Sequence, residues 1–231
     1  MYRLFYSPGA CSLAPHIVLE EVCRPYELEL CSARNNGEGT GAPAYLSINP
    51  KGRVPALAGV PGRSGGTEGL LTEASAILLY LGRRFPEAGL LPADPSAEAR
   101  CLEWLNWLSD TVHSMSLAQI WRPQRFVSDP ALFSAVTDKG HANLKEQYAF
   151  IESILSDGRH WAIPQGYSVA DPFLLVFWRW GGKVGLNMAK SYPAWTALTA
   201  KVVRRPPVWR ALEQEGLHAE PELAGLRDLP P

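Results

Sequence analysis

Cys11 has the clearest capacity for covalent chemistry in this chain, because of its sequence surroundings. It follows an aromatic-rich strand pattern over 2–6 and a Ser-Pro-Gly-Ala turn, and it precedes an apolar helical pattern over 12–22. A cysteine at the start of a helix lies near unpaired backbone N–H groups and the positive end of the helix dipole. Both favour the thiolate, so the position predicts a lowered pKa and a reactive sulfur. A small buried core thiol is the alternative, and the residues alone leave both open.

Two further segments carry groups suited to a peptide-like ligand. Residues 51–55 (KGRVP) precede a strand pattern, and the backbone beside such a proline is free to pair with an added strand. An ordinary trans Val54–Pro55 bond is the more frequent form, and a cis bond is the alternative. Residues 72–75 (TEAS) open the next helix, where Thr72 is expected to cap the helix and Glu73 suits its dipole. A grip of Glu73 on a ligand amine is the functional alternative.

Polar side chains also interrupt the apolar and aromatic helical pattern over 97–127. Asn106 and His113 are seven residues apart, so on an α-helix they share one face. Most stripes of this kind are the solvated side of a helix, and a ligand-facing pair is the alternative. Residues 168–171 (SVAD) form a capping box with Asp in place of Glu or Gln, which predicts a structural role at the start of a buried helix.

Two regions of different character would position these residues. Strand patterns cover 2–6, 26–31, 54–58 and 69–71, and helical patterns cover 12–22 and 72–84. This order, βαβ followed by ββα, predicts an α/β domain over 1–85. Three prolines mark 86–96 as a linker. An all-α domain is expected over 97–231, with helices over 97–127, 131–157, 168–184, 193–204 and 207–215.

Composition disfavours several classes of function. With 22 Lys and Arg against 23 Asp and Glu, the net charge is −1, and no basic excess supports binding to nucleic acid. No apolar run approaches the roughly 20 residues of a membrane helix, and the first residues lack a secretory pattern. We therefore expect a cytoplasmic protein without membrane association. The four cysteines and five histidines show no metal-ligand spacing, which predicts free thiols and no metal.

Together these motifs resemble a cytosolic glutathione transferase, most closely the bacterial beta class. The resemblance covers nearly the whole chain, and its motifs follow the family's order. They lie within Phe5–Leu13, Asn49–Leu57, Leu71–Ile77, Glu103–His113 and Ser168–Asp171. Each motif alone is weakly specific, and all of them in order are strongly so. The resemblance implies a thioredoxin-like first domain, a helical second domain, a homodimer, and glutathione as co-substrate.

The resemblance also implies roles for residues of the first domain. Cys11 matches the cysteine beside the glutathione sulfur and would be catalytic. Val54 matches the residue whose backbone pairs with the cysteinyl part of glutathione, with Pro55 cis. Glu73 and the N–H of Ala74 match the grip on the γ-glutamyl end.

In the helical domain, the resemblance implies that Asn106 and His113 reach the ligand. His113 would act as an orienting or electrostatic residue in catalysis, and Trp180 matches an aromatic residue near the active site. The candidates for the lining of the electrophile pocket are Trp121, Arg122, Phe126, Trp178 and Trp180.

Departures from the family pattern bear on glutathione affinity. Ala74 stands where the family usually has serine, so a hydroxyl contact is lost and the backbone N–H is kept. A lysine expected after the second strand is missing: Asn35 and Asn36 stand there, with Arg34 as a nearby substitute. One lost hydrogen bond to a charged partner is worth roughly 1.5–3 kcal/mol, so binding would fall about tenfold or more. The segment 59–66 is longer than a tight hairpin and would edge the site or the dimer.

The implied function is conjugation of the glutathione thiol to small apolar electrophiles. In this class the cysteine can also form a mixed disulfide, so a glutathione-dependent disulfide reductase, isomerase or dehalogenase is an alternative on the same fold. A non-catalytic ligand-binding scaffold is the other alternative. The intact set of Cys11, Val54-Pro55 and Glu73 favours an enzyme.

Overall fold

One four-stranded mixed sheet organises the N-terminal part of the computed structural model, which describes residues 1–33, 39–62 and 69–227. Strand β1 (Tyr2–Tyr6) pairs in parallel with β2 (Tyr26–Leu30) and antiparallel with β3 (Ala56–Val60). Strand β4 (Gly69–Thr72) pairs antiparallel with β3, giving the order β2-β1-β3-β4. The predicted strands are confirmed, although β3 begins two residues later than expected, after Val54 and Pro55.

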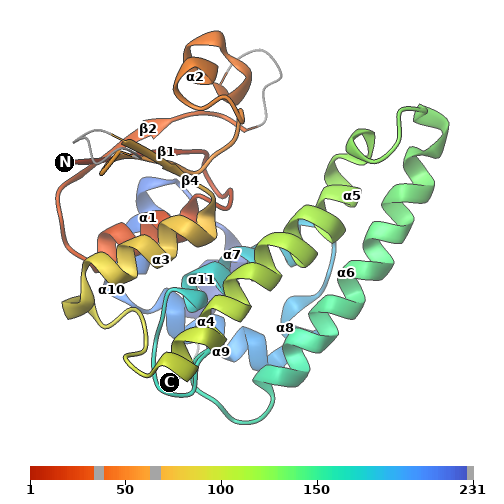
Figure 1. The fold of residues 1–231 in the computed structure, drawn as a ribbon. Coiled ribbons are helices and arrows are strands. Elements are labelled where there is room, and N and C mark those ends of the chain that lie inside the picture. The colour runs from red at the N-terminus through yellow and green to blue at the C-terminus, as the bar shows by residue number, and fades with distance from the viewer. Residues whose placement is uncertain (34–38, 63–68, 228–231) are drawn as a thin grey trace.

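Helices α1 (Leu13–Glu21) and α3 (Ala74–Arg84) lie together against one face of this sheet (Figure 1). Their apolar side chains, among them Leu13, Ile17 and Ile77, are fully buried against Leu4 and Leu57 of the strands. The short helix α2 (Pro43–Ile48) lies away from α1 and α3 and is absent from the predicted elements. The layout is the predicted thioredoxin-like fold.

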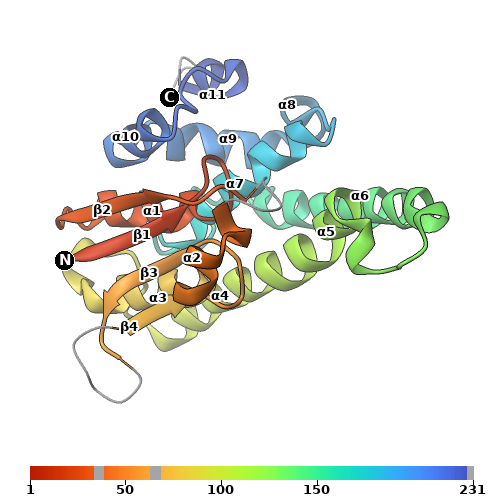
Figure 2. The same cartoon turned by 90° about the horizontal axis from the view of Figure 1, so that it is seen from above.

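The rest of the described chain is helical, as predicted. The helices are α4 (Pro95–Trp107), α5 (Ala118–Trp121), α6 (Phe133–Leu155), α7 (Ala170–Lys183), α8 (Met188–Ser191), α9 (Pro193–Val203), α10 (Pro206–Gln214) and α11 (Pro221–Arg227). The last helices return beside the first ones, and α10 packs on α1 (Figure 2). Within the described ranges, no helix is long and apolar enough to cross a membrane.

The helix predicted over 97–127 is confirmed in part: the chain is helical without a break from Pro95 to Trp121, but it is not one regular α-helix. Helix α4 ends at Trp107, and the chain continues as a π-helical segment, Leu108–Leu117, before α5. A short 3₁₀ turn, Pro123–Arg125, follows. The wider π turns break the regular 3.6-residue spacing on which the prediction of a shared face for Asn106 and His113 rested.

Helix α4 begins inside the predicted linker 86–96. Asp94 caps it by accepting a hydrogen bond of 2.8 Å from the Ala97 N–H, and Pro95 occupies the first helical position. A 3₁₀ turn also covers Pro86–Ala88. The division into domains at 1–85 and 97–231 stays a prediction.

Candidate functional site

Cys11 lies in the loop between β1 and α1, as predicted, but its thiol is not activated. Its side chain is only 9% exposed, and Sγ donates a hydrogen bond of 3.4 Å to the Val54 carbonyl oxygen. Burial raises the pKa of the Cys11 thiol to about 12, and the nearby Glu73 carboxylate also raises it. The backbone N–H groups at the helix start lower the pKa, but by less than burial raises it. The expected lowering of the Cys11 pKa is therefore wrong, and Cys11 is a neutral hydrogen-bond donor.

The Val54–Pro55 peptide bond is cis, as the family resemblance implies. The loop before it is fixed at the Arg53 carbonyl, which accepts from Tyr45 Oη at 2.7 Å and from Asn49 Nδ2 at 2.8 Å. Among the described residues, the Val54 N–H has no hydrogen-bond partner. Val54 thus presents a free backbone donor beside a carbonyl occupied only by the Cys11 thiol.

Glu73 stands at the start of α3 in an unusual backbone conformation, with φ of 74°. Its side chain is 67% exposed and pairs with Lys51 Nζ at 2.6 Å. Thr72 does not cap the helix, as its hydroxyl accepts from Lys51 Nζ at 2.9 Å instead, so that prediction is wrong. The α3 N-terminus beginning at Ala74 keeps unpaired N–H groups next to the Glu73 carboxylate.

His113 lies against aromatic side chains of α7, in the π-helical segment. The centroid of its ring is 4.8 Å from that of Trp180 and 6.1 Å from that of Phe177. Burial lowers the pKa of His113 to about 4, and the positive charges of Arg53, Arg125 and Arg122 lower it further. Asn106, by contrast, is exposed at the end of α4. His113 is therefore a neutral imidazole beside the site, and the ligand contact of Asn106 stays a prediction.

The pH dependence of conjugation tests the charge state of His113. With a pKa of about 4, the imidazole stays neutral over the ordinary working range. We expect His113→Gln to lower kcat/KM. Between about pH 5.5 and 8, the plot of kcat/KM against pH should have the same shape in the variant as in the wild type. An inflection of kcat/KM near pH 6–7 that is present in the wild type and absent in the variant would contradict a neutral His113.

Three of the five aromatic and basic residues predicted to line a pocket, Trp121, Arg122 and Trp180, lie near this histidine. The Trp121 ring is 5.3 Å from the Trp180 ring, and Arg122 and Phe126 follow Trp121 in the chain. Trp178 does not join them, because it lies two residues from Trp180 on α7 and faces the other way. Its Nε1 donates to Thr196 Oγ1 at 3.0 Å, and its side chain is buried. Trp178 is a core residue, which corrects its assignment to the pocket.

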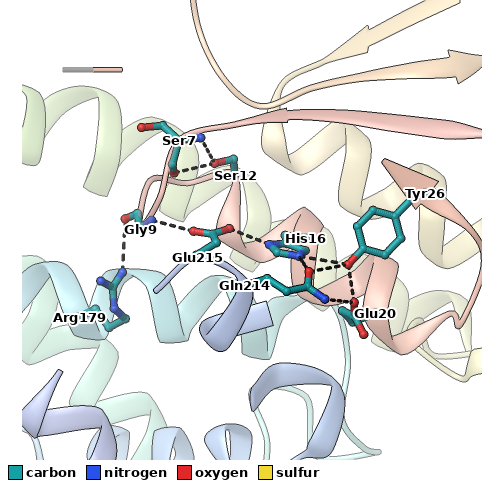
Figure 3. Close-up of polar contacts among 9 residues, drawn as sticks. All are labelled: Ser7, Gly9, Ser12, His16, Glu20, Tyr26, Arg179, Gln214 and Glu215. Atoms are coloured by element: carbon teal, nitrogen blue, oxygen red, sulfur yellow. Dashed lines mark hydrogen bonds and ion pairs between the residues drawn. The ribbon is translucent and has the colours of Figure 1, made fainter. Parts of the chain in front are cut away.

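The loop that carries Cys11 is held by groups from the C-terminal helices (Figure 3). The Gly9 N–H donates to Glu215 Oε2 at 2.7 Å, and the Gly9 carbonyl accepts from Trp180 Nε1 at 2.9 Å and from Arg179 Nη1 at 3.3 Å. Gly9 has φ of 69°, and a Cβ there would meet the Arg179 guanidinium at 3.0 Å. Only glycine fits this position without strain.

Behind this loop, His16 on α1 forms a buried pair with the same glutamate (Figure 3). His16 Nδ1 is 2.8 Å from Glu215 Oε1, and both side chains are fully buried. On the other side of the ring, Nε2 is 2.7 Å from Gln214 Oε1, whose amide nitrogen donates to Glu20. Both ring nitrogens of the buried His16 therefore have polar partners, and Glu215 joins His16 to the loop at Gly9. No sequence pattern predicts this role for His16, because its partners lie some 200 residues away.

Some predicted features fall outside the described residues. These are Arg34, Asn35 and Asn36, and residues 63–66 of the predicted loop 59–66. Within 1–33, 39–62 and 69–227, no three His, Cys, Asp or Glu side chains gather where they could hold a metal ion.

Comparisons with known proteins point to one family. Residues 9–84 match the family model of the glutathione S-transferase N-terminal domain. Glutathione S-transferase GstA of Escherichia coli O157:H7 is 34% identical over 220 residues, covering 93% of this chain and 99% of that protein.

Solved structures agree over the whole fold. A glutathione transferase homolog from Sulfitobacter with bound glutathione superposes with a TM-score of 0.82 at 31% identity, covering 94% of this chain and 99% of its own. A bacterial beta class glutathione S-transferase from Sphingomonas chungbukensis gives a TM-score of 0.76 at 32% identity, covering 93% of this chain and 99% of its own. With relatives matched at this identity over nearly their full length, the chain belongs to the glutathione S-transferase family.

Proposed function

We propose that this protein conjugates the thiol of glutathione to small electrophiles, with the site built around Cys11, Val54 and Glu73. The observation that carries the proposal is the backbone of Val54: its N–H has no partner among the described residues, and its carbonyl accepts from the Cys11 thiol. A peptide-like ligand laid along this backbone would pair with Val54 as an added strand and bring its own thiol next to Cys11.

The two ends of glutathione would be held by the start of α3 and by charged side chains. Glu73 would share its carboxylate between Lys51 and the γ-glutamyl ammonium. The N–H of Ala74, at the N-terminus of an eleven-residue helix, would donate to the γ-glutamyl carboxylate. Asn106 and His113 would approach from the helical part of the chain.

In the reaction, the glutathione sulfur attacks an electrophilic carbon, a C–S bond forms, and a leaving group such as chloride departs with the electron pair. The thiol proton passes to solvent. The neutral Cys11 thiol supports this chemistry, since it can donate a hydrogen bond to the developing glutathione thiolate and so stabilise it. The same burial and raised pKa disfavour Cys11 as an attacking thiolate, which favours conjugation over disulfide exchange.

Turnover of glutathione with 1-chloro-2,4-dinitrobenzene tests this role. We expect Cys11→Ala to lower kcat/KM by about tenfold or more, because a hydrogen bond to a charged sulfur is worth roughly 1.5–3 kcal/mol. Cys11→Ser, which keeps a donor, should retain most of the activity. Equal activity in wild type and Cys11→Ala would remove Cys11 from the mechanism.

Two further measurements separate the alternatives. Faster turnover of a small disulfide such as 2-hydroxyethyl disulfide than of the chloroarene would favour a disulfide reductase. The absence of glutathione binding by calorimetry at millimolar ligand would favour a scaffold.

We further propose that the protein is a beta class enzyme, acts as a homodimer and works in the cytoplasm. The similarity to the Sphingomonas chungbukensis beta class structure and the position of Cys11 support the class assignment.

A further inference from the structure

Three arginines converge on the region around His113 from two parts of the chain. Arg122 and Arg125 lie at the end of α5 and in the 3₁₀ turn after it, and Arg53 lies in the loop before β3. Arg122 Nη2 donates a hydrogen bond of 3.0 Å to the Ala33 carbonyl, which places its guanidinium over the loop that follows β2. This contact joins the end of α5 to the N-terminal part of the chain at Ala33.

None of these three arginines has a carboxylate partner among the residues that the structure describes. Eight other described arginines form ion pairs with Asp or Glu. Glu73, whose carboxylate charge also acts on His113, is paired with Lys51. The cluster of Arg53, Arg122 and Arg125 is thus an excess of positive charge in a chain whose net charge is −1.

The charges of the cluster act on one another and on His113. Burial lowers the pKa of Arg125, and repulsion from Arg53 and Arg122 lowers it further. The same three arginines add to the effect of burial in lowering the pKa of His113. Such repulsion is relieved by an anion bound among the guanidinium groups, which present paired donors matched to a carboxylate.

Aromatic surface lies directly beside the cluster. Trp121 is 42% exposed, although its ring packs edge-on at 5.3 Å against the buried Trp180. Phe126, next to Arg125, is 38% exposed. Trp180 in turn donates to the Gly9 carbonyl, two residues before Cys11. A flat aromatic ligand that packs on Trp121 would lie between the arginines and the thiol groups of Cys11 and glutathione.

We infer that the second substrate is an aromatic electrophile that carries a carboxylate or a similar fixed anion, which Arg122 and Arg125 bind. The inference rests on the proposed conjugation and replaces the expectation of a purely apolar electrophile. Arg53, adjacent to Val54, lies on the glutathione side, whereas Arg122 and Arg125 belong to the second-substrate side. In a chloroarene of this type, the glutathione sulfur bonds to the ring carbon, chloride leaves, and the thiol proton goes to solvent.

A matched pair of substrates tests this inference: 4-chloro-3-nitrobenzoate and its neutral analogue 4-chloro-3-nitrobenzamide. The kcat/KM of each is divided by its uncatalysed rate with glutathione, to remove the difference in ring reactivity. For the wild type we expect the rate enhancement to be about tenfold or more larger for the benzoate, and to fall toward that of the benzamide as salt is added.

Arginine variants identify the groups responsible. Arg122→Ala and Arg125→Ala should each lower the benzoate-to-benzamide ratio by about fivefold to tenfold, with the KM for glutathione unchanged. Arg122→Lys should keep part of the preference, since it keeps the charge and loses the paired donors. Arg100→Ala removes the same charge from an exposed site on α4 and should leave the ratio unchanged. Benzamide turnover reports in each variant whether the protein is folded and active.

The outcomes separate this inference from the proposed function. Turnover of neither substrate would count against conjugation itself. Equal rate enhancement for the two substrates would overturn the inferred anionic substrate and leave conjugation standing. A benzoate-to-benzamide ratio that is unchanged in Arg122→Ala and Arg125→Ala would do the same. A raised KM for glutathione with an unchanged ratio would do the same, because it would assign the arginines to glutathione.

Discussion

Glu215→Ala should lower the free energy of unfolding by about 2–6 kcal/mol, because it leaves the buried His16 ring and the Gly9 N–H without their acceptor. Glu215 uses both carboxylate oxygens, one on His16 Nδ1 at 2.8 Å and one on the Gly9 N–H at 2.7 Å. Both donors become unsatisfied in the alanine variant. Unfolding in urea, followed by far-UV circular dichroism, measures the loss.

The same change should disturb catalysis in whatever fraction remains folded, since Gly9 lies two residues from Cys11. We expect a lower kcat with 1-chloro-2,4-dinitrobenzene at temperatures where the variant is still native. Glu215→Gln should be milder, at about 1–3 kcal/mol, because an amide oxygen still accepts from Gly9. Glu213→Ala is the matched control on the same helix, where the glutamate accepts only an exposed bond from Trp209. A Glu215→Ala variant as stable as Glu213→Ala would refute the buried pair.

Asp171→Ala should lower the free energy of unfolding by about 2–6 kcal/mol, because it leaves two buried N–H groups without an acceptor. The fully buried Asp171 carboxyl accepts from the Ala162 N–H at 2.8 Å and from the Ser168 N–H at 2.7 Å, and also from the Ser168 hydroxyl. The predicted capping box is thus confirmed as a structural feature. It does more than cap α7, since it also fixes the loop at Ala162. Against a typical total of about 5–15 kcal/mol, this loss threatens folding at 37 °C.

The pH dependence of stability distinguishes Asp171 from a surface carboxylate. Burial raises the pKa of Asp171 to about 7, well above the ordinary value of 3.8. Because the folded state then holds a proton that the unfolded state has released, the contribution of Asp171 to stability falls as pH rises from about 4 to 7. Asp171→Asn should remove this slope, whereas Asp157→Ala, at an exposed carboxylate, should leave it. An unchanged slope in Asp171→Asn would show that the carboxyl is ionised throughout.

The features that sequence reasoning predicted well are those specified by neighbouring residues. The strands of the sheet, the capping box at Ser168 and the placement of Cys11 at a helix start all depend on a few adjacent side chains. The cis bond at Val54 was not favoured by the residues alone, and it followed only from the family pattern.

The predictions that the structure contradicts concern properties that depend on burial and on contact between distant segments. The pKa of Cys11 depends on how completely the folded chain covers it, and no local pattern reports that. Trp178 and Trp180 look alike in sequence, yet they face opposite sides of α7. The charge imbalance around Arg122 and Arg125 was also invisible, because six other described arginines, among them Arg179 and Arg205, pair with carboxylates that only the fold brings near.

The hydrogen bond from the Gly9 N–H to Glu215 can form only late in protein synthesis. The two residues are 206 positions apart, so at about 5–20 residues per second the ribosome delivers the glutamate roughly 10–40 s after the glycine. Throughout that interval α1 exposes the surface that α7 and α10 later cover. The loop beside Cys11 therefore reaches its working shape only after the last helices emerge. A chain truncated before α10 would contain every residue predicted to contact glutathione. It would still lack the Glu215 carboxylate that fixes the loop at Gly9.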